Sequence, residues 1–383
     1  MSLVVRSFAL CLLLYSVLDI GRCTHTLKQV QVLFRHGERA PLKKEMYPND
    51  PHSVSDYLPW DLGQLTNIGK LREFRIGEML RARYNDFLGD YYYPKDIYGR
   101  SSDSDRTKMS LQLVLSSLYP AKNFQNWNPN LPWLPIPTHY APENLDILMR
   151  PHLCTQFTQH LGEIKRNPTV ISLIAQYSEL FEFLSTTTGF NITTTTQVYE
   201  IYNLLVAQKS MNLTLPQWCT EKIFEDMGNV TVLEYKILSF DKHLKRLNGG
   251  TLVRRFVDNM NVTGKRSGHR KLYLYSGHEV NIAAFLRAHD ITKPALPVYG
   301  TAVIFEKLEN ATGDVFVKMF VWTGITEEII PLKIGDCDYL CPIDTYLNIV
   351  KDVLPSDKEL NCHLDKLSHE DLAHLYDEKI SFN

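Results

Sequence analysis

Apolar positions in the first part of the chain predict one strand and two helices. The run Leu27–Phe34 is rich in β-branched and apolar residues and loses its polar alternation in its second half, which is typical of a buried strand. After a proline-punctuated loop, Thr66 is placed to cap a long helix through about Leu88. A second helix is expected over Arg106–Leu118, because the following Tyr-Pro pair disfavours helical backbone.

The middle and the end of the chain differ in pattern. Residues 123–136 are rich in Pro, Trp and Asn and predict a long crossing loop, and residues from about 150 to 262 read as mainly helical. Strand character returns in Lys271–Ser276, followed by an apolar helix from about Asn281 to His289. Two further apolar runs, Thr301–Leu308 and Val315–Trp322, predict a hairpin.

This order predicts an α/β fold with a mixed central sheet flanked by helices. Residues 24–125 and 263–383 would form the discontinuous α/β domain, and residues 126–262 an inserted, mostly helical cap domain. The two buried strands are each followed by a loop that carries a histidine. If these strands are parallel neighbours, both loops emerge at one carboxyl edge, where open α/β sheets bind ligands.

Residues 1–23 have the pattern of a secretory signal peptide. Arg6 supplies the positive charge, Phe8–Leu18 the apolar run, and the residues before Cys23 a small-residue cleavage site. The alternative is a membrane anchor, which needs about 20 apolar residues and so fits this run less well. We expect a mature chain that begins near Thr24, is secreted rather than held in the lysosomal lumen, and has no membrane partner.

Composition and charge narrow the class of protein further. The 383 residues are 44% hydrophobic, and 41 basic residues stand against 43 acidic ones, which is ordinary for a globular protein. Because the charge is nearly balanced and no long basic block occurs, we expect no nucleic-acid partner. Five N-x-[ST] sequons predict a glycoprotein. They lie at Asn191, Asn212, Asn229, Asn261 and Asn310.

Removal of the signal peptide leaves an odd number of cysteines. Cys337 and Cys341 are close enough to close a small loop, while residue spacing leaves open which of the other three is unpaired. These three are Cys154, Cys219 and Cys362.

The stretch R-H-G-x-R-x-P, residues 35–41, carries the candidate chemistry. Arg35 and Arg39 place two guanidinium groups around the imidazole of His36, and guanidinium forks match the oxygens of a phosphate group. Their charge lowers the pKa of the histidine and keeps a lone pair available. The pattern predicts a phosphate site with a nucleophile in it, and a surface loop with incidental charges is the alternative.

Three motifs together resemble the histidine acid phosphatases, the acid phosphatase and phytase branch of the histidine phosphatase superfamily. They are R-H-G-x-R-x-P, the Asp103-x-Asp105-Arg106-Thr107-x-Met109-Ser110 segment and Gly277-His278-Glu279. The similarity runs from about Leu27 to Cys362 and is strongest toward the insect venom, prostatic and lysosomal enzymes.

The resemblance implies a role for each motif residue. His36 would be the nucleophile that forms a phosphohistidine, Arg35, Arg39 and Arg106 would clamp the phosphate, and His278 would donate to its oxygens.

The chain departs from the family at one position. The commonest family pattern has His-Asp where this chain has His278-Glu279, and the acidic residue there protonates the leaving alcohol. Glutamate keeps a carboxylic acid of similar intrinsic pKa but moves its proton by about a bond length. We therefore expect activity with a changed range of leaving groups.

The resemblance also implies the cysteine pairing and the assembly. It pairs Cys154 with Cys362 and Cys337 with Cys341, and it leaves Cys219 without a partner. It implies no metal and no cofactor, and homodimers occur in the family, so a homodimer is a candidate assembly. The H-E-D-L-A-H segment near the C-terminus lacks the i,i+4 histidine spacing of a zinc helix.

The function expected from these observations is a secreted, metal-independent acid phosphatase for small phosphomonoesters, with phosphoproteins as further candidate substrates. One alternative is a phytase, although the cap lacks the excess of Lys and Arg that an inositol hexaphosphate should attract. The other is a catalytically weak, venom-type secreted binding protein, suggested by the replacement at Glu279.

Overall fold

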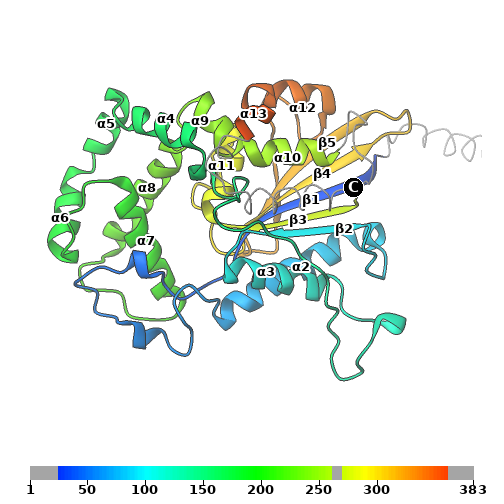
Figure 1. Ribbon diagram of the computed structural model, residues 1–383, viewed down its shortest axis with the longest axis horizontal. Coiled ribbons are helices and arrows are strands. Elements are labelled where there is room, and N and C mark those ends of the chain that lie inside the picture. The colour runs from blue at the N-terminus through cyan, green and yellow to red at the C-terminus, as the bar shows by residue number, and fades with distance from the viewer. Residues whose placement is uncertain (1–24, 261–269, 361–383) are drawn as a thin grey trace, which may run out of the picture.

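The computed structural model describes residues 25–260 and 270–360, and its centre is a seven-stranded mixed sheet (Figure 1). The strand order is β2-β3-β1-β4-β5-β6, and β7 pairs with β5. β2, β3 and β1 are parallel, whereas β4 pairs antiparallel with β1 and the remaining strands continue antiparallel. The strands are β1 (Thr26–Arg35), β2 (Ile97–Ser101), β3 (Leu272–Gly277), β4 (Ala302–Glu309), β5 (Val315–Trp322), β6 (Ile329–Leu332) and β7 (Cys341–Pro342).

Helices cover both faces of the sheet (Figure 1). The pair α2 (Asn67–Leu88) and α3 (Asp105–Leu118) packs on one face. The other face carries α10 (Gly250–Met260), α11 (Glu279–Ala288) and α12 (Ile343–Val350). No helix among residues 25–260 and 270–360 has the length and apolar character needed to cross a membrane.

Alternation along β1 explains the two layers. Val30, Val32 and Phe34 pack into the apolar cluster with α2 and α3, while Leu33 belongs to the cluster with α10 and α11. Successive side chains of a strand point to opposite faces, so a strand buried on both faces is apolar almost throughout. The buried, polar Gln31 is an exception to this pattern. Its side chain is hydrogen-bonded, because its Nε2 donates to the Phe256 carbonyl oxygen of α10 at 2.9 Å.

A separate helical body lies at one end of the sheet, at the left of Figure 1. It has two apolar clusters of its own, one among α6, α7 and α8 and one among α4, α5, α8 and α9. We propose that this body, residues 155–247, is the cap domain, because α10 packs on the sheet through Phe256 and Met260. Its helices are α4 (Thr155–Lys165), α5 (Pro168–Ala175), α6 (Ser178–Thr188), α7 (Thr195–Ser210), α8 (Glu221–Ile237) and α9 (Lys242–Leu247).

The predicted elements agree closely with the observed ones. The α/β class, the parallel pairing of β1 with β3, the Thr66 cap of α2 and the β4–β5 hairpin are confirmed. The residues around 123–136 form the expected loop, with one short 3-10 turn. The strand β2 was not predicted, because its five residues, Ile97–Ser101, include a glycine and an arginine. The helix expected from Asn281 begins earlier, at Glu279.

The cysteines and sequons lie partly within the described residues. Cys337 and Cys341 form a disulfide, and Cys219 is free. Cys154 is disulfide-bonded, and Cys362, its implied partner, lies outside the described residues, as do the predicted signal peptide and Asn261. Of the other sequons, Asn310 is partly exposed and the remaining three are exposed.

The start of α2 packs directly under the loop after β1. A Cβ on Gly37 would lie 2.3 Å from the Gly69 carbonyl oxygen, so this backbone contact needs glycine. One turn further along α2, Glu73 is fully buried, and neither of its carboxyl oxygens has a hydrogen-bond partner among the described residues. Burial, and then the charge of Glu38, raise the pKa of Glu73 well above its ordinary value. Glu73 is therefore held as a neutral acid.

A buried neutral acid makes the fold more stable in acid than at neutral pH. The unfolded chain releases this proton near pH 4.5 and the folded chain does not, so each pH unit above that value costs about 1.4 kcal/mol until the folded pKa is reached. Glu73→Gln should therefore raise the melting temperature more at pH 7 than at pH 4, measured by calorimetry. Glu78→Gln, an exposed position on the same helix, is the control. An equal shift at both pH values would contradict a neutral Glu73.

Candidate active site

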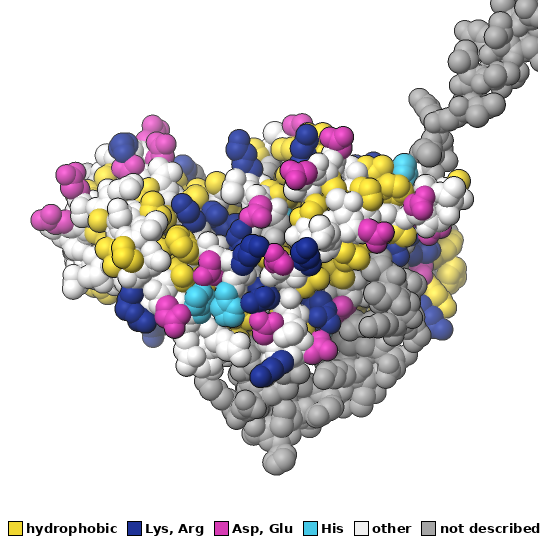
Figure 2. All heavy atoms as spheres, turned by 90° about the horizontal axis from the view of Figure 1, so that it is seen from above, with side chains coloured by type: hydrophobic (Ala, Val, Ile, Leu, Met, Phe, Trp, Pro, Cys, Tyr) yellow, Lys and Arg dark blue, Asp and Glu magenta, His cyan; other side chains and the backbone are white. Residues whose placement is uncertain are grey.

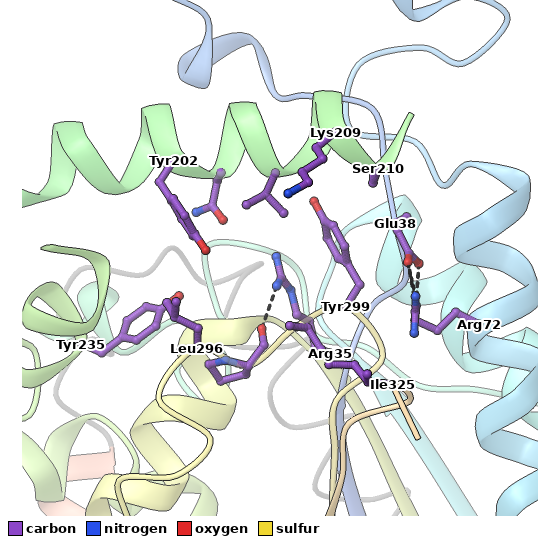
Figure 3. A pocket seen from close by; sticks show the side chains of 14 residues that line it. Arg35, Glu38, Arg72, Tyr202, Lys209, Ser210, Tyr235, Leu296, Tyr299 and Ile325 are labelled. Carbon is purple, nitrogen blue, oxygen red and sulfur yellow. Dashed lines mark hydrogen bonds and ion pairs between the residues drawn. The ribbon is translucent and has the colours of Figure 1, made fainter. Parts of the chain in front are cut away.

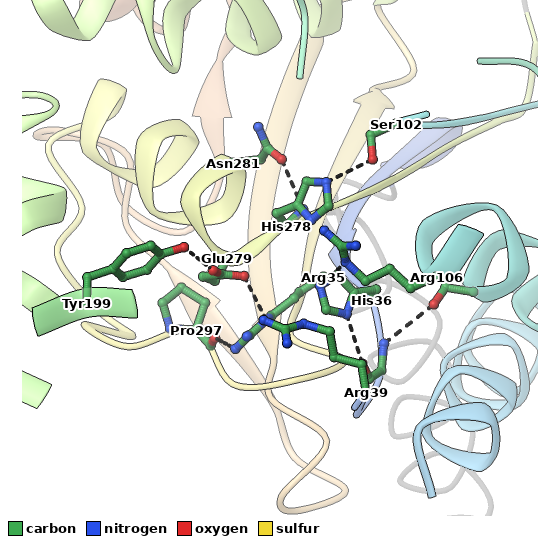
Figure 4. Close-up of polar contacts among 12 residues, drawn as sticks. Arg35, His36, Arg39, Ser102, Arg106, Tyr199, His278, Glu279, Asn281 and Pro297 are labelled. Atoms are coloured by element: carbon green, nitrogen blue, oxygen red, sulfur yellow. Dashed lines mark hydrogen bonds and ion pairs between the residues drawn. The ribbon is translucent and has the colours of Figure 1, made fainter. Parts of the chain in front are cut away.

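The parallel pairing of β1 with β3 brings the two histidine loops together. Arg35 lies opposite Gly277 in the register, and the His36 amide donates to the Gly277 carbonyl oxygen at 3.1 Å. The imidazole rings of His36 and His278 meet edge to face with centroids 5.4 Å apart (Figure 4). The predicted shared edge is thus observed.

His36 lies at the centre of the cluster and is only 1% exposed. Its Nδ1 donates to the Gly37 carbonyl oxygen at 2.8 Å, and its Nε2 accepts from Arg106 Nε at 3.1 Å. Burial, and then the charge of Arg106, lower the pKa of His36 well below its ordinary value. The ring is therefore neutral, with its proton on Nδ1 and its lone pair on Nε2, on the side of Arg106.

Arg39 and Arg106 add positive charge around this lone pair. Arg39 is buried and is held by both oxygens of Glu45, at 2.9 and 2.6 Å. Arg106 is the second residue of α3, and burial together with the charge of Arg39 lowers its pKa to about 10. It stays charged in acid and at neutral pH. Among the described residues the Arg106 side chain donates only to His36 Nε2, so its guanidinium retains donors for an oxyanion.

Arg35 is paired with Glu279. Their Nε and Oε2 atoms are 3.1 Å apart, and Arg35 Nη1 donates to the Pro297 carbonyl oxygen at 2.7 Å. The other Glu279 oxygen accepts from the Tyr199 hydroxyl of α7 at 2.5 Å (Figure 4). Burial alone would raise the pKa of Glu279, but the charge of Arg35 and the other partners outweigh it and lower the pKa to about 2.

This pairing has a consequence for acid stability. Because the folded pKa lies below the ordinary value of 4.5, the Arg35–Glu279 pair stabilises the fold fully above pH 4.5. The contribution is lost only as the pH falls toward 2. In the ligand-free protein Glu279 is therefore a carboxylate across the mildly acidic range.

His278 is the N-cap residue of α11 and faces the end of β2. Its backbone amide donates to Asn281 Oδ1 at 3.0 Å, which closes the first turn of the helix. Its Nε2 is 2.9 Å from Ser102 Oγ, which in turn contacts the hydroxyl of Thr107. Burial, followed by the charge of Arg106, lowers the pKa of His278, so its ring is neutral as well.

The structure brings all six predicted site residues into one cluster, and it adds four that the sequence did not indicate. Glu45, Ser102, Tyr199 and Tyr299 each contact one of the six. Tyr199 comes from the cap and Tyr299 from the loop before β4, so no local spacing relates them to the motifs. For Glu45 the only signal was an acid shortly after the R-H-G-x-R-x-P stretch.

The site has the donors for an oxyanion rather than for a cation. Two neutral imidazoles and three guanidinium groups converge on it, while its carboxylates are paired. Within residues 25–260 and 270–360, no group of three or more His, Cys, Asp or Glu side chains is arranged to hold a metal ion. On the face of the molecule seen in Figure 2, basic and acidic side chains are interspersed.

Comparison of the sequence with known proteins gives consistent matches. A family model described as the histidine phosphatase superfamily, branch 2, matches residues 26–321. Venom acid phosphatase Acph-1 of Apis mellifera is 43% identical over 88% of this chain and 87% of its own length. Prostatic acid phosphatase of Bos taurus is 31% identical over 90% of each chain, and lysosomal acid phosphatase of Homo sapiens 30% identical over 88% of this chain and 81% of its own.

Solved structures agree on the fold. The Hafnia alvei phytase in complex with myo-inositol hexakis sulphate superposes with a TM-score of 0.68, covering 88% of this chain and 98% of that one at 18% identity. The Klebsiella phytase gives 0.67 over 89% and 99% at 15% identity. The family match over most of the chain and the identity to three acid phosphatases establish that this chain belongs to the histidine phosphatase superfamily, branch 2, as a histidine acid phosphatase.

Proposed function

We propose that this acid phosphatase works through a phosphohistidine on His36 Nε2. The observation that carries the proposal is the state of that atom, which carries no proton and whose lone pair accepts from the Arg106 guanidinium in a buried, cationic pocket. A nucleophile of this kind attacks phosphorus while Arg35, Arg39 and Arg106 stabilise charge on the equatorial oxygens. His278 is the further donor to these oxygens.

The reaction takes two displacements. In the first, Nε2 forms a bond to phosphorus, the bond from phosphorus to the ester oxygen breaks, and the leaving oxygen takes a proton from Glu279. In the second, water attacks phosphorus, the P–N bond breaks, and Glu279 recovers a proton from the water. The products are an alcohol and inorganic phosphate, and His36 returns to its neutral form.

Glu279 needs a proton that it lacks in the ligand-free protein. A bound phosphate group brings negative charge close to Glu279 and draws the Arg35 guanidinium toward its own oxygens. Both effects raise the pKa of Glu279. Substrate binding therefore favours protonation of Glu279, the acid that protonates the leaving group. The proton comes from the acidic solution.

His36→Ala should abolish turnover of a small aryl phosphate, by at least about 10³-fold, because the covalent step is removed. The measurement is a pH-rate profile between pH 3 and 8 with a chelator present. His160→Ala, a histidine of the cap that pairs with Asp241, is the matched control and should keep the wild-type profile. Substantial acid-optimal turnover by folded His36→Ala would rule out the phosphohistidine.

Glu279→Gln should separate substrates by leaving group. Alkyl alcohols need protonation as they leave and aryl alcohols need it less, so the loss of kcat should be larger for alkyl phosphates by about 10²-fold. Glu279→Asp, which restores the commoner family residue, keeps the acid and should retain turnover of both classes. Wild-type rates of Glu279→Gln on alkyl phosphates would exclude Glu279 as the acid.

We also propose that the mature protein is secreted after loss of residues 1–23 and carries glycans. The relatives include a venom enzyme and lysosomal enzymes, and three of the described sequons are exposed. Small phosphomonoesters are the substrate class of the family, and phosphoproteins and a homodimer remain proposals. The solved phytases, at 15 to 18% identity, bear on the fold and give the phytase alternative no separate support.

A further inference from the structure

A cavity lies beside the site, between α7 of the cap and the loop that leads into β4 (Figure 3). Its volume is about 410 Å³, within the range of small-molecule sites. Among the described site residues only Arg35 and Tyr299 line it, whereas His36, Arg106 and His278 do not.

Three buried polar side chains line the inner part of this cavity without being satisfied. Arg35 Nη2, Asn203 Nδ2 and Tyr299 Oη have no hydrogen-bond partner among the described residues. These three residues are only 4%, 3% and 5% exposed. Leaving such buried groups unpaired is unfavourable. Groups of this kind at a cavity wall indicate a ligand that accepts hydrogen bonds there.

The charged residues that line the cavity favour a ligand with negative charge. Arg35, Arg72 and Lys209 bring three positive charges to its lining, and Glu38 is the single acid. Glu38 is already satisfied, because both of its oxygens accept from Arg72 Nε, at 2.7 and 2.8 Å. Arg35 is paired with Glu279, which does not line the cavity. The unpartnered Nη2 donor of Arg35 and the positive charge of Lys209 favour an oxyanion placed between them.

The other residues that line the cavity favour a flat, apolar group as the rest of this ligand. Tyr202 and Tyr235 lie on the cap side and Leu296 on the side of the β4 loop, as Figure 3 shows. Tyrosine rings and a leucine side chain present flat apolar surface, which an aromatic or other planar group covers well. Lys209 and Ile325 are exposed and form a rim, while the unpaired donors lie deeper.

We propose that this cavity binds a small organic carboxylate with a flat apolar body, at a site that adjoins the phosphate site and shares Arg35 with it. The carboxylate accepts from Arg35 Nη2 and Asn203 Nδ2, and the apolar body lies against the tyrosines. Because Arg35 also pairs with Glu279, an occupant of the cavity competes for the guanidinium that holds that acid. Occupancy is thereby coupled to catalysis, and the coupling acts in both directions.

The test uses 2-naphthoate as the probe and the full-length, glycosylated enzyme. Binding is followed by saturation-transfer NMR, with enough vanadate present to fill the phosphate site. We expect binding to persist under these conditions, and 2-naphthoate to lower kcat for a small aryl phosphate even at saturating substrate. The neutral amide of the same ring system should bind at least about tenfold more weakly, since it lacks the charge that Arg35 and Lys209 attract.

Substitutions of residues that line the cavity test whether naphthoate binds there. Asn203→Asp keeps the size of the side chain and replaces a donor by a negative charge, so it should weaken naphthoate at least about tenfold. Lys209→Ala should weaken it about threefold through lost attraction. Lys222→Ala removes the same charge from α8, where Lys222 pairs with Asp226, and should change nothing. Turnover of the aryl phosphate without naphthoate reports that each variant is folded.

Three results would overturn the proposal. One is no binding of naphthoate by the wild type, another is full displacement of naphthoate by vanadate, and the third is unchanged affinity in folded Asn203→Asp. None of them bears on His36, whose phosphohistidine is tested separately by its own pH-rate profile.

Discussion

The parallel hydrogen-bonded ladder between β1 and β3 is the constraint on which the site depends. It fixes Arg35 opposite Gly277, and the residue after each of these is a histidine. Parallel neighbours end at one edge, so segments far apart in the chain enter the same pocket with no freedom in their relative position. The apolar alternation of β1 holds this register, because a slip by one residue would turn Val30, Val32 and Phe34 toward the wrong layer of helices.

With the β1–β3 pairing in place, the largest unfavourable contribution at the site is the burial of several positive charges close together. Arg35 and Arg39 are buried next to one another, with Arg106 close by, and a cluster of buried cations is costly without partners. Glu279 neutralises Arg35 and Glu45 holds Arg39 through both oxygens, while the partner of Arg106 within the described residues is the neutral His36. The unbalanced charge therefore falls beside His36, the nucleophile that we propose, where a phosphate group would complete the balance. Binding the dianion and stabilising the ligand-free fold are two aspects of the same arrangement.

The features that could be predicted from the sequence are those that depend on residues close together in the chain. A β-branched run, a capping Thr66 and the R-H-G-x-R-x-P stretch are each contained within a few residues, and so the strand, the helix and the oxyanion site followed from them. Tyr199 and Tyr299 did not follow, because their roles exist only after the cap and the β4 loop have folded against the sheet. The short strand β2 was missed for a related reason, since it is stabilised by pairing with β3 rather than by a pattern of its own. The same applies to the buried Glu73, whose neutrality is a property of its surroundings.

The substitution at the acid position connects the cap to the chemistry. A glutamate reaches one methylene further than the aspartate commonest in the family, and in this chain that reach ends between Arg35 of the sheet and the hydroxyl of Tyr199 on α7. A shorter side chain at this position would reach less far toward the cap. The longer one places the carboxylate where a displacement of α7 alters its hydrogen bonding and hence its pKa. The helical cap therefore takes part in the chemistry we propose, because the Tyr199 hydroxyl adds to the charge of Arg35 in holding Glu279 as a carboxylate.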